Sequence, residues 1–95
     1  MNELATVAIV VPCNNVADIV DKCINSLIRQ EYPQDKFSII AINDGSTDNT
    51  KEHLEVFKTH PNFYLFDHKK NKGLSATRNT GIKNSQSEIV CFFGQ

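Results

Sequence analysis

The sequence has no excess of charge of one sign, because its ten Lys and Arg residues and eleven Asp and Glu residues leave a net charge of -1. Binding to DNA or RNA depends on concentrated lysine and arginine that neutralise phosphates. We therefore expect no nucleic-acid partner. The N-terminus also lacks the basic stretch of a signal peptide, and no apolar run is long enough for a secretion signal or a membrane span. These features favour a cytoplasmic location.

Several motifs of known chemistry are missing. The three cysteines are an odd number at spacings that match no zinc pattern, which is typical of reduced, unpaired thiols. His53, His60 and His68 share no ligand spacing, and we expect them at the surface or in turns. No Ser-His-Asp or Cys-His arrangement is discernible. Neither a G-x-G-x-x-G nor a G-x-x-x-x-G-K-[ST] motif follows the first apolar run, which disfavours a dinucleotide-binding domain.

Short β-branched runs alternate with stretches whose apolar residues recur at helical spacing. Pro12 is expected to end the first strand and Asn15 to cap the first helix, while Ser46 or Thr47 is expected to cap the second. The pattern predicts strands over residues 6–11, 37–42, 63–66 and 89–93, separated by helices over residues 16–30, about 47–60 and 73–84.

Nearly continuous apolar strands joined by helices indicate a mainly parallel sheet of about four strands, covered on both faces. The sequence thus predicts one α/β unit over residues 1–95, a Rossmann-like three-layer α/β/α sandwich. Gly81 weakens the third helix by roughly 1 kcal/mol relative to alanine. Close packing of that helix on the sheet is the expected compensation.

Polar clusters follow three of the predicted strands, at the sheet edge where open α/β proteins bind ligands. Asp44 stands at a strand end, beside Gly45 and a hydroxyl cap, and can accept hydrogen bonds from a base or ribose. A plain strand-to-helix turn explains this cluster equally well. Arg78, near the start of the third helix, offers paired donors to a base carbonyl or phosphate. A solvated arginine is the alternative.

These clusters, taken together, resemble glycosyltransferase family 2. The family shows Pro-x-Tyr-Asn, Asp-Asp-Gly-Ser-x-Asp and Asn-x-Gly-x-x-x-Ala-Arg-Asn in this order. The corresponding segments are Pro12-Cys13-Asn14-Asn15, Asn43-Asp44-Gly45-Ser46-Thr47-Asp48 and Asn71-Lys72-Gly73-Leu74-Ser75-Ala76-Thr77-Arg78-Asn79. The resemblance implies an A-type glycosyltransferase fold with strand order 3-2-1-4, of which this chain is the N-terminal, nucleotide-sugar-binding portion.

The resemblance also implies roles for single residues. Asp44 would bind the nucleotide base, and Arg78 would contact the base or a phosphate. The family reaction is inverting displacement at the anomeric carbon of a nucleotide sugar, most often a UDP-sugar, with transfer to a glycan or another acceptor. The complete enzyme would work in the cytoplasm or at the cytoplasmic face of a membrane. The nucleotide-binding residues carried over are Pro12, Asn14, Asn15, Asp44, Ser46, Asn71, Gly73 and Arg78.

Two departures from the family pattern affect these expectations. Asn14 replaces an aromatic residue, which weakens packing around the nucleotide. The fourth strand runs into Gly94-Gln95, where the family has the Asp-x-Asp that holds Mg²⁺ or Mn²⁺. We therefore expect no metal ligand and no catalytic residue in this truncated chain, and no sugar transfer by the chain alone.

An alternative interpretation is a non-catalytic, truncated or degenerate domain that folds and associates with itself. With strand order 3-2-1-4, the segment Ile89-Val90-Cys91-Phe92-Phe93 forms an uncovered apolar edge. Such an edge presents unpaired backbone groups to another chain. The sequence therefore leaves two functions open, donor binding and self-association.

Overall fold

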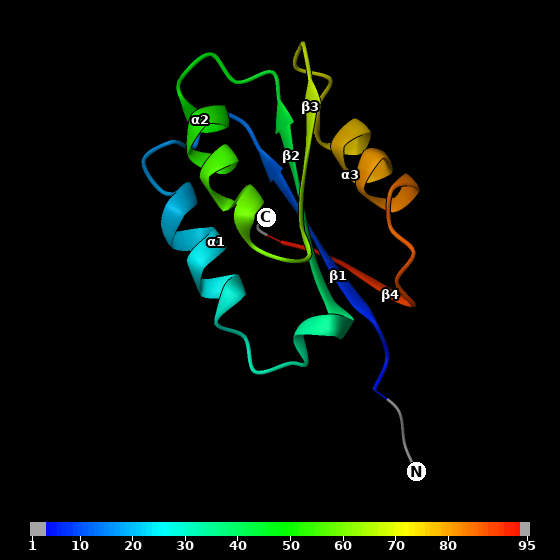
Figure 1. The fold of residues 1–95 in the computed structure, drawn as a ribbon. Helices are drawn as coiled ribbons and strands as arrows, with labels where there is room; N and C mark the ends of the chain where they lie inside the picture. The colour runs from blue at the N-terminus through cyan, green and yellow to red at the C-terminus, as the bar shows by residue number, and fades with distance from the viewer. Residues whose placement is uncertain (1–3, 94–95) are drawn as a thin grey trace.

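The computed structural model describes residues 4–93 and contains four strands joined by helices within that range (Figure 1). The elements are β1 (Val7–Cys13), α1 (Val20–Ile28), a 3-10 turn (Gln34–Lys36), β2 (Phe37–Asp44), α2 (Thr50–Glu55) with a 3-10 extension (Val56–Thr59), β3 (Phe63–His68), α3 (Leu74–Lys83) and β4 (Ile89–Phe92).

The four strands form one parallel sheet in the order β3-β2-β1-β4, which confirms the predicted order and the α/β class. The register pairs Val7 with Phe37, and Asp44 with His68. Because all strands run in the same direction, their carboxyl ends meet at one edge of the sheet. The loops that follow β1, β2 and β3 are therefore neighbours.

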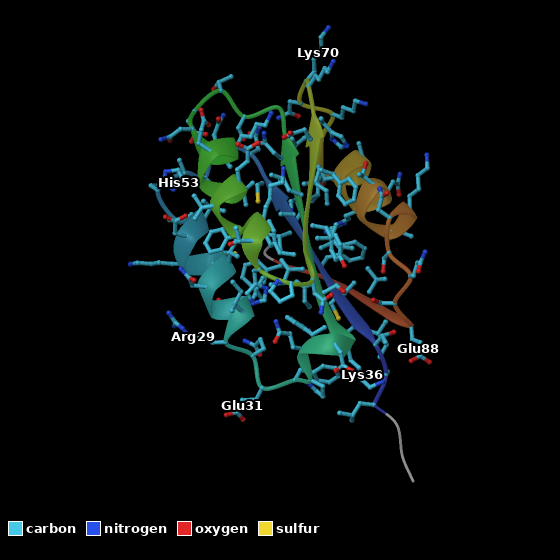
Figure 2. The ribbon with its side chains drawn as sticks, viewed as in Figure 1. Arg29, Glu31, Lys36, His53, Lys70 and Glu88 are labelled. Carbon is cyan, nitrogen blue, oxygen red and sulfur yellow. The ribbon has the colours of Figure 1, made fainter. Side chains whose placement is uncertain are left out.

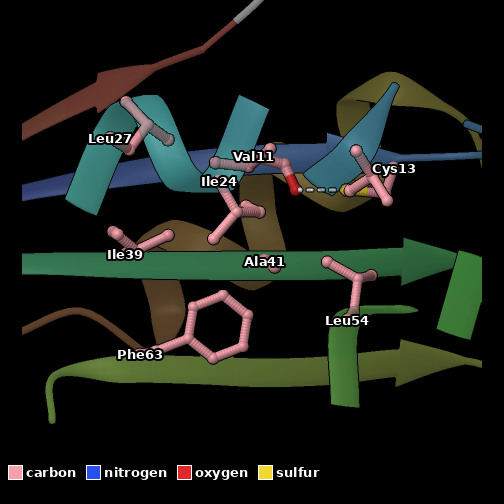
Figure 3. Close-up of a cluster of buried hydrophobic side chains, with 9 residues drawn as sticks. Val11, Cys13, Ile24, Leu27, Ile39, Ala41, Leu54 and Phe63 are labelled. Atoms are coloured by element: carbon pink, nitrogen blue, oxygen red, sulfur yellow. Dashed lines mark hydrogen bonds between the residues drawn. The ribbon is translucent and has the colours of Figure 1, made fainter. Parts of the chain in front are cut away.

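Helices cover both faces of the sheet, α1 and α2 one face and α3 the other, as Figure 1 shows. The side of α1 that faces the sheet carries Val20, Ile24 and Leu27, which are buried and spaced at helical intervals. Between these two helices and the sheet lies the larger core cluster, most of which Figure 3 labels: Val11, Cys13, Val20, Ile24, Leu27, Ile39, Ala41, Leu54 and Phe63.

The core on the α3 face is smaller and consists of Ala8, Val10, Ile40 and Ile42. Here α3 lies directly on β1, because Gly81 has no side chain to hold the two apart. A Cβ atom built on Gly81 would lie 2.5 Å from Cγ1 and 2.6 Å from Cγ2 of Val10. The close packing predicted for Gly81 is thus confirmed.

Pro12 was predicted to end the first strand, and this prediction is wrong. The residue lies within β1 and pairs in register with Ile42. A proline has no N–H to donate, so its position between two other strands needs an explanation. Val10 accepts a hydrogen bond from Phe93 on the β4 side. Pro12, two residues on, presents its nitrogen to the same side, where the pairing of β1 with β4 has already ended.

The helix starts also differ from the prediction. The first α-helix begins at Val20 rather than residue 16, and its N-cap is Ile19 without a side-chain hydrogen bond. Asn15 has a φ of 54° and does not cap this helix. The N-cap of the second helix is Asn49, which makes no side-chain hydrogen bond, so neither Ser46 nor Thr47 caps this helix; the Thr50 N–H at its start donates to Asp48 Oδ1 at 2.9 Å.

Because Val10 is fully buried and β-branched, it has no room to yield to a larger side chain at position 81. We expect Gly81→Ala to lower the free energy of unfolding by about 1–3 kcal/mol, although alanine is the better helix former. Urea unfolding at neutral pH measures the change. The control is Asn79→Ala on the exposed side of α3, which should stay within about 0.5 kcal/mol of wild type. An unchanged or stabilised Gly81→Ala protein contradicts the packing argument.

Candidate functional site

A cleft of about 260 Å³ lies at the carboxyl ends of β1 and β2, against the start of α3. Ligand pockets usually measure roughly 300–1,000 Å³, so this cleft has room for only part of a nucleotide-sized molecule. The residues that line it are Pro12, Cys13, Asn14, Val16, Asp44, Asn71, Gly73, Leu74 and Thr77.

A larger groove of about 380 Å³ lies toward the amino ends of the strands, beside Ser38, Tyr64 and Asn84. Ligands of open α/β sheets bind beyond the carboxyl ends of the strands. All three polar clusters singled out in the sequence contribute to the smaller cleft and none to this groove. We therefore take the smaller cleft as the candidate site.

Asp44 is the most connected side chain of the cleft. Its Oδ1 accepts hydrogen bonds from the His68 ring at Nδ1 (2.9 Å) and from the Lys72 backbone N–H (2.9 Å). Its Oδ2 accepts from the Gly73 N–H at 3.0 Å. Asp44 is 4% exposed, and such burial by itself raises a carboxyl pKa. The bonds from Lys72, His68 and Gly73 outweigh burial, so the pKa of Asp44 is lowered and the carboxylate stays ionised.

His68 was expected at the surface or in a turn, and this prediction is wrong. Its side chain is 8% exposed and lies between Asp44 and Thr80, with 2.8 Å from His68 Nε2 to Thr80 Oγ1. The predicted third strand ended at Phe66, whereas β3 continues to His68. Nothing in the motifs pointed to His68, and only a longer strand would have placed it opposite Asp44.

The loop between β3 and α3 rests on Gly45, which has a φ of 65°. A Cβ atom at Gly45 would overlap the Asn71 nitrogen and the Lys70 carbonyl carbon, so the close contact requires glycine. Gly73, with a φ of 93°, turns the chain into α3. Figure 2 shows Lys70 at the tip of this loop, at the opposite end of the molecule from Lys36. The loop thus forms one wall of the cleft.

Asn14 and Asn15 connect the end of β1 to the loop after β2. Asn14 Nδ2 donates to the Asp44 carbonyl at 2.7 Å, and Asn14 lines the cleft. Asn15 Oδ1 accepts from the N–H groups of Thr47 (2.8 Å) and Asp48 (3.1 Å), while its own N–H donates to Ser46 Oγ at 3.0 Å. Asn15 and Ser46 therefore hold the two loops together and do not line the cleft.

Arg78 lies beside β4 rather than in the cleft. Its guanidinium carbon is 5.4 Å from the centroid of the Phe92 ring, a distance typical of cation–π contact. Its Nε is buried and makes no hydrogen bond within residues 4–93. Of the eight residues predicted to bind nucleotide, the structure brings five into the cleft: Pro12, Asn14, Asp44, Asn71 and Gly73.

The cleft offers no obvious nucleophile, and the described residues offer no metal centre. Burial, with the nearby Cys23 second, raises the pKa of Cys13 to about 12, so this thiol stays protonated at neutral pH. Residues 4–93 contain no group of three His, Cys, Asp or Glu side chains placed to hold a metal ion. The position expected to replace the family's Asp-x-Asp, Gly94 and Gln95, lies outside the described residues. No helix of the described part is long and apolar enough to cross a membrane.

The parallel sheet and its strand order match the Rossmann-like A-type fold of solved glycosyltransferases. A mannosyltransferase from Pyrobaculum calidifontis, solved with GDP-Man and Mn²⁺, matches 93% of this chain with a TM-score of 0.86 and 26% identity. TarS from S. aureus, solved with UDP, matches 93% with a TM-score of 0.85 and 27% identity. The chain covers 26% of each of these two structures.

The chain belongs to glycosyl transferase family 2, whose sequence profile matches residues 8–95. Among curated relatives, the glycosyltransferase AglE of Haloferax volcanii is 34% identical over 90 residues, which are 94% of this chain. The chain spans only 30% of the length of AglE.

Replacing the Asp44 carboxylate tests its role in joining the loops. Asp44→Asn places an NH₂ group against at least one of the three donors, so we expect a loss of about 1–3 kcal/mol in the free energy of unfolding at pH 7. Because the folded-state pKa is lowered, the carboxylate contributes fully above the ordinary aspartate pKa, and this contribution is lost as pH falls through the lower folded value. The difference between wild type and Asp44→Asn should therefore shrink below about pH 4. Urea unfolding across this pH range measures it.

The matched control is Asp18→Asn, which changes an exposed carboxylate and should leave stability within about 0.5 kcal/mol of wild type. A difference between wild type and Asp44→Asn that is the same at pH 3 and pH 7 would show that the charge of Asp44 does not hold the loops.

Proposed function

We propose that this chain is the donor-binding part of an inverting glycosyltransferase that uses a UDP-sugar as its nucleotide-sugar donor and transfers the sugar to a glycan or another acceptor. The observation that carries the proposal is the cleft itself, where the segments after three neighbouring strands meet at Asp44: Asn14 donates to its backbone carbonyl, and the amides of Lys72 and Gly73 donate to its carboxylate. The two matching structures support it, since one was solved with UDP and the other with GDP-Man and Mn²⁺.

In this proposal, Asp44 contacts the nucleotide base. A carboxylate has room for about four hydrogen bonds, and three are already made within the protein. The remaining position is on Oδ2, which accepts only from Gly73, and it suits a single N–H such as the imide of uracil. Asn14 and Asn71, which also line the cleft, bind the base or ribose, and Pro12 forms an apolar wall.

Arg78 serves the diphosphate in this proposal. Phe92 holds the guanidinium at the end of β4, and the buried Nε has no partner among the described residues. The paired terminal N–H groups of the guanidinium match the geometry of phosphate oxygens and would be the donors to the diphosphate. Asn15 and Ser46 act indirectly, because their hydrogen bonds fix the loops that shape the cleft.

In the complete enzyme, a divalent cation would neutralise charge on the leaving diphosphate. The described residues provide no group that fits this ion, so we assign it no ligand and no reaction step in this chain. The residues of the cleft bind and orient the donor. The chain spans about a quarter of the matching structures, and we propose that it does not transfer sugar by itself. We also propose that the complete enzyme works in the cytoplasm or at the cytoplasmic face of a membrane.

An NMR titration of the chain with UDP, uridine and GDP tests the donor site. We expect saturable shifts of the Asn14, Asn71 and Gly73 amides with UDP, weaker shifts with GDP, and no effect of added Mn²⁺ or Mg²⁺ on affinity. Arg78→Ala should weaken UDP binding about ten-fold or more, as expected for a hydrogen bond to a charged group, and leave uridine binding unchanged.

The control is Lys36→Ala, which does not line the cleft and lies at the opposite end of the molecule from Lys70 (Figure 2), and it should bind UDP like wild type. An absence of saturable shifts with every nucleotide rules out the donor site. Equal losses for UDP and uridine in Arg78→Ala rule out the phosphate role of Arg78.

A second candidate function is self-association through β4. Ile89 is 46% exposed, Phe92 39% and Phe93 36%, and within the described residues β4 pairs with β1 alone. We propose that a second copy of this chain covers this edge, because an apolar strand with one free side pairs readily with an identical strand.

Analytical ultracentrifugation at high micromolar concentration tests this association. We expect the wild-type chain to sediment as a dimer and Ile89→Lys as a monomer, since a buried lysine opposes pairing of the two edges. A monomeric wild-type chain at that concentration eliminates this function and leaves the donor-binding proposal intact.

A further inference from the structure

The His68 ring lies outside the cleft and connects three elements of the fold. It belongs to β3, and its two nitrogens contact the Asp44 carboxylate at the end of β2 and the Thr80 hydroxyl of α3, at 2.9 Å and 2.8 Å. Its side chain is 8% exposed and that of Asp44 is 5% exposed, so water has little access to the bond between them. A buried ring with both nitrogens paired is held in one orientation.

The hydrogen-bond pattern assigns the proton on this ring. Asp44 accepts hydrogen bonds from the amides of Lys72 and Gly73 and is ionised, and an ionised carboxylate can only accept. Nδ1 of His68 must therefore carry the hydrogen and donate it to Oδ1. Thr80 Oγ1 then donates to Nε2 when the ring is neutral, and accepts from it when the ring is charged. The contact between His68 and Asp44 is compatible with both states.

We propose that His68 is a positioning residue of the candidate site, which holds the Asp44 carboxylate against the amides of Lys72 and Gly73 and so fixes the loop over residues 69–73 before a ligand binds. The loop part of this inference stands on the contacts alone. Its consequence for nucleotide affinity rests on the proposed function.

Two geometric facts connect His68 to the ligand. First, Oδ1 is shared between His68 and Lys72, so the ring fixes the rotation of the carboxylate and directs Oδ2 to the Gly73 N–H. Second, Gly73 and Asn71 line the cleft, whereas His68 does not. A change at His68 therefore reaches the ligand only through Asp44 and the loop.

Two variants of His68 separate the donated hydrogen bond from the ring itself. His68→Ala removes the donor, while His68→Asn keeps an N–H donor near the position of Nδ1. The control is His53→Ala, which removes the other histidine paired with an aspartate. His53 lies 3.1 Å from Asp21 at an exposed site on the opposite face of the sheet.

Amide hydrogen exchange of the ligand-free chain gives the first measurement. We expect the Lys72 and Gly73 amides to exchange about ten- to a hundred-fold faster in His68→Ala, the range for hydrogen bonds that involve a charged group. The Ile40 amide in the central sheet should change less, because it reports global opening. His68→Asn should restore most of the protection, and His53→Ala should match wild type.

Two further measurements complete the test. Nitrogen NMR of the imidazole should show the proton on Nδ1 of His68 in the wild-type chain. UDP affinity should fall about ten-fold in His68→Ala and largely recover in His68→Asn, as the loop amides do.

Unchanged exchange at Lys72 and Gly73 in His68→Ala overturns the proposal. If exchange at Lys72 and Gly73 increases only as much as at Ile40, the variant is generally destabilised and the proposal is overturned. A wild-type ring without a proton on Nδ1 of His68 also overturns it. If the loop amides respond as expected but the wild-type chain binds no UDP, the role of His68 in fixing the loop stands and the nucleotide assignment fails.

Discussion

The site depends on the hydrogen bonds that the Asp44 carboxylate accepts, because they join parts of the chain that are far apart in the sequence. Asp44 stands at the end of β2 and accepts from His68 on β3 and from two amides at the entrance to α3. Buried backbone N–H groups need partners, and a charged acceptor provides stronger bonds than a neutral one. A single ionised group thus satisfies three donors and sets the position of the loop that forms one wall of the cleft.

A second set of contacts joins the loops after β1 and β2 on the side of α1 and α2. Asn15 accepts from the amides of Thr47 and Asp48, and the Ala17 N–H donates to Asp48 Oδ2 at 3.3 Å. The Val16 N–H likewise donates to Thr50 Oγ1 at 2.9 Å. Each loop therefore satisfies backbone groups of the other, and at the start of α1, whose N-cap makes no side-chain hydrogen bond, these contacts stand in for local capping. The strand ends are consequently fixed relative to one another on both faces of the sheet.

The sequence was sufficient for the strands, their order and the two-sided cover, because apolar periodicity and the family motifs report them directly. The sequence was insufficient to predict the role of a residue that depends on contacts with segments distant in the sequence. Asn15 is a residue type that often caps helices, yet its side-chain oxygen accepts from the Thr47 N–H in the loop after β2 and does not cap α1. Proline usually marks the end of a strand, yet Pro12 lies within β1. The sheet accommodates it because the pairing of β1 with β4 ends before this position. His68 carried no local signal, since its function follows from the register that sets it opposite Asp44.

These contacts also explain why the predicted site residues divide into two groups. Asn15 and Ser46 each use a side-chain oxygen to accept from backbone N–H groups of a neighbouring loop, do not line the cleft, and act by fixing the loops. Among residues 4–93, Asp44 retains one acceptor position, Asn14 uses its amide nitrogen but not its oxygen, and Arg78 Nε has no partner. Position together with the hydrogen-bonding capacity left after folding, rather than the motif itself, therefore indicates which of the predicted residues can recognise a donor: Asp44 and Asn14 through acceptors beside the cleft, and Arg78 through its cation beside β4.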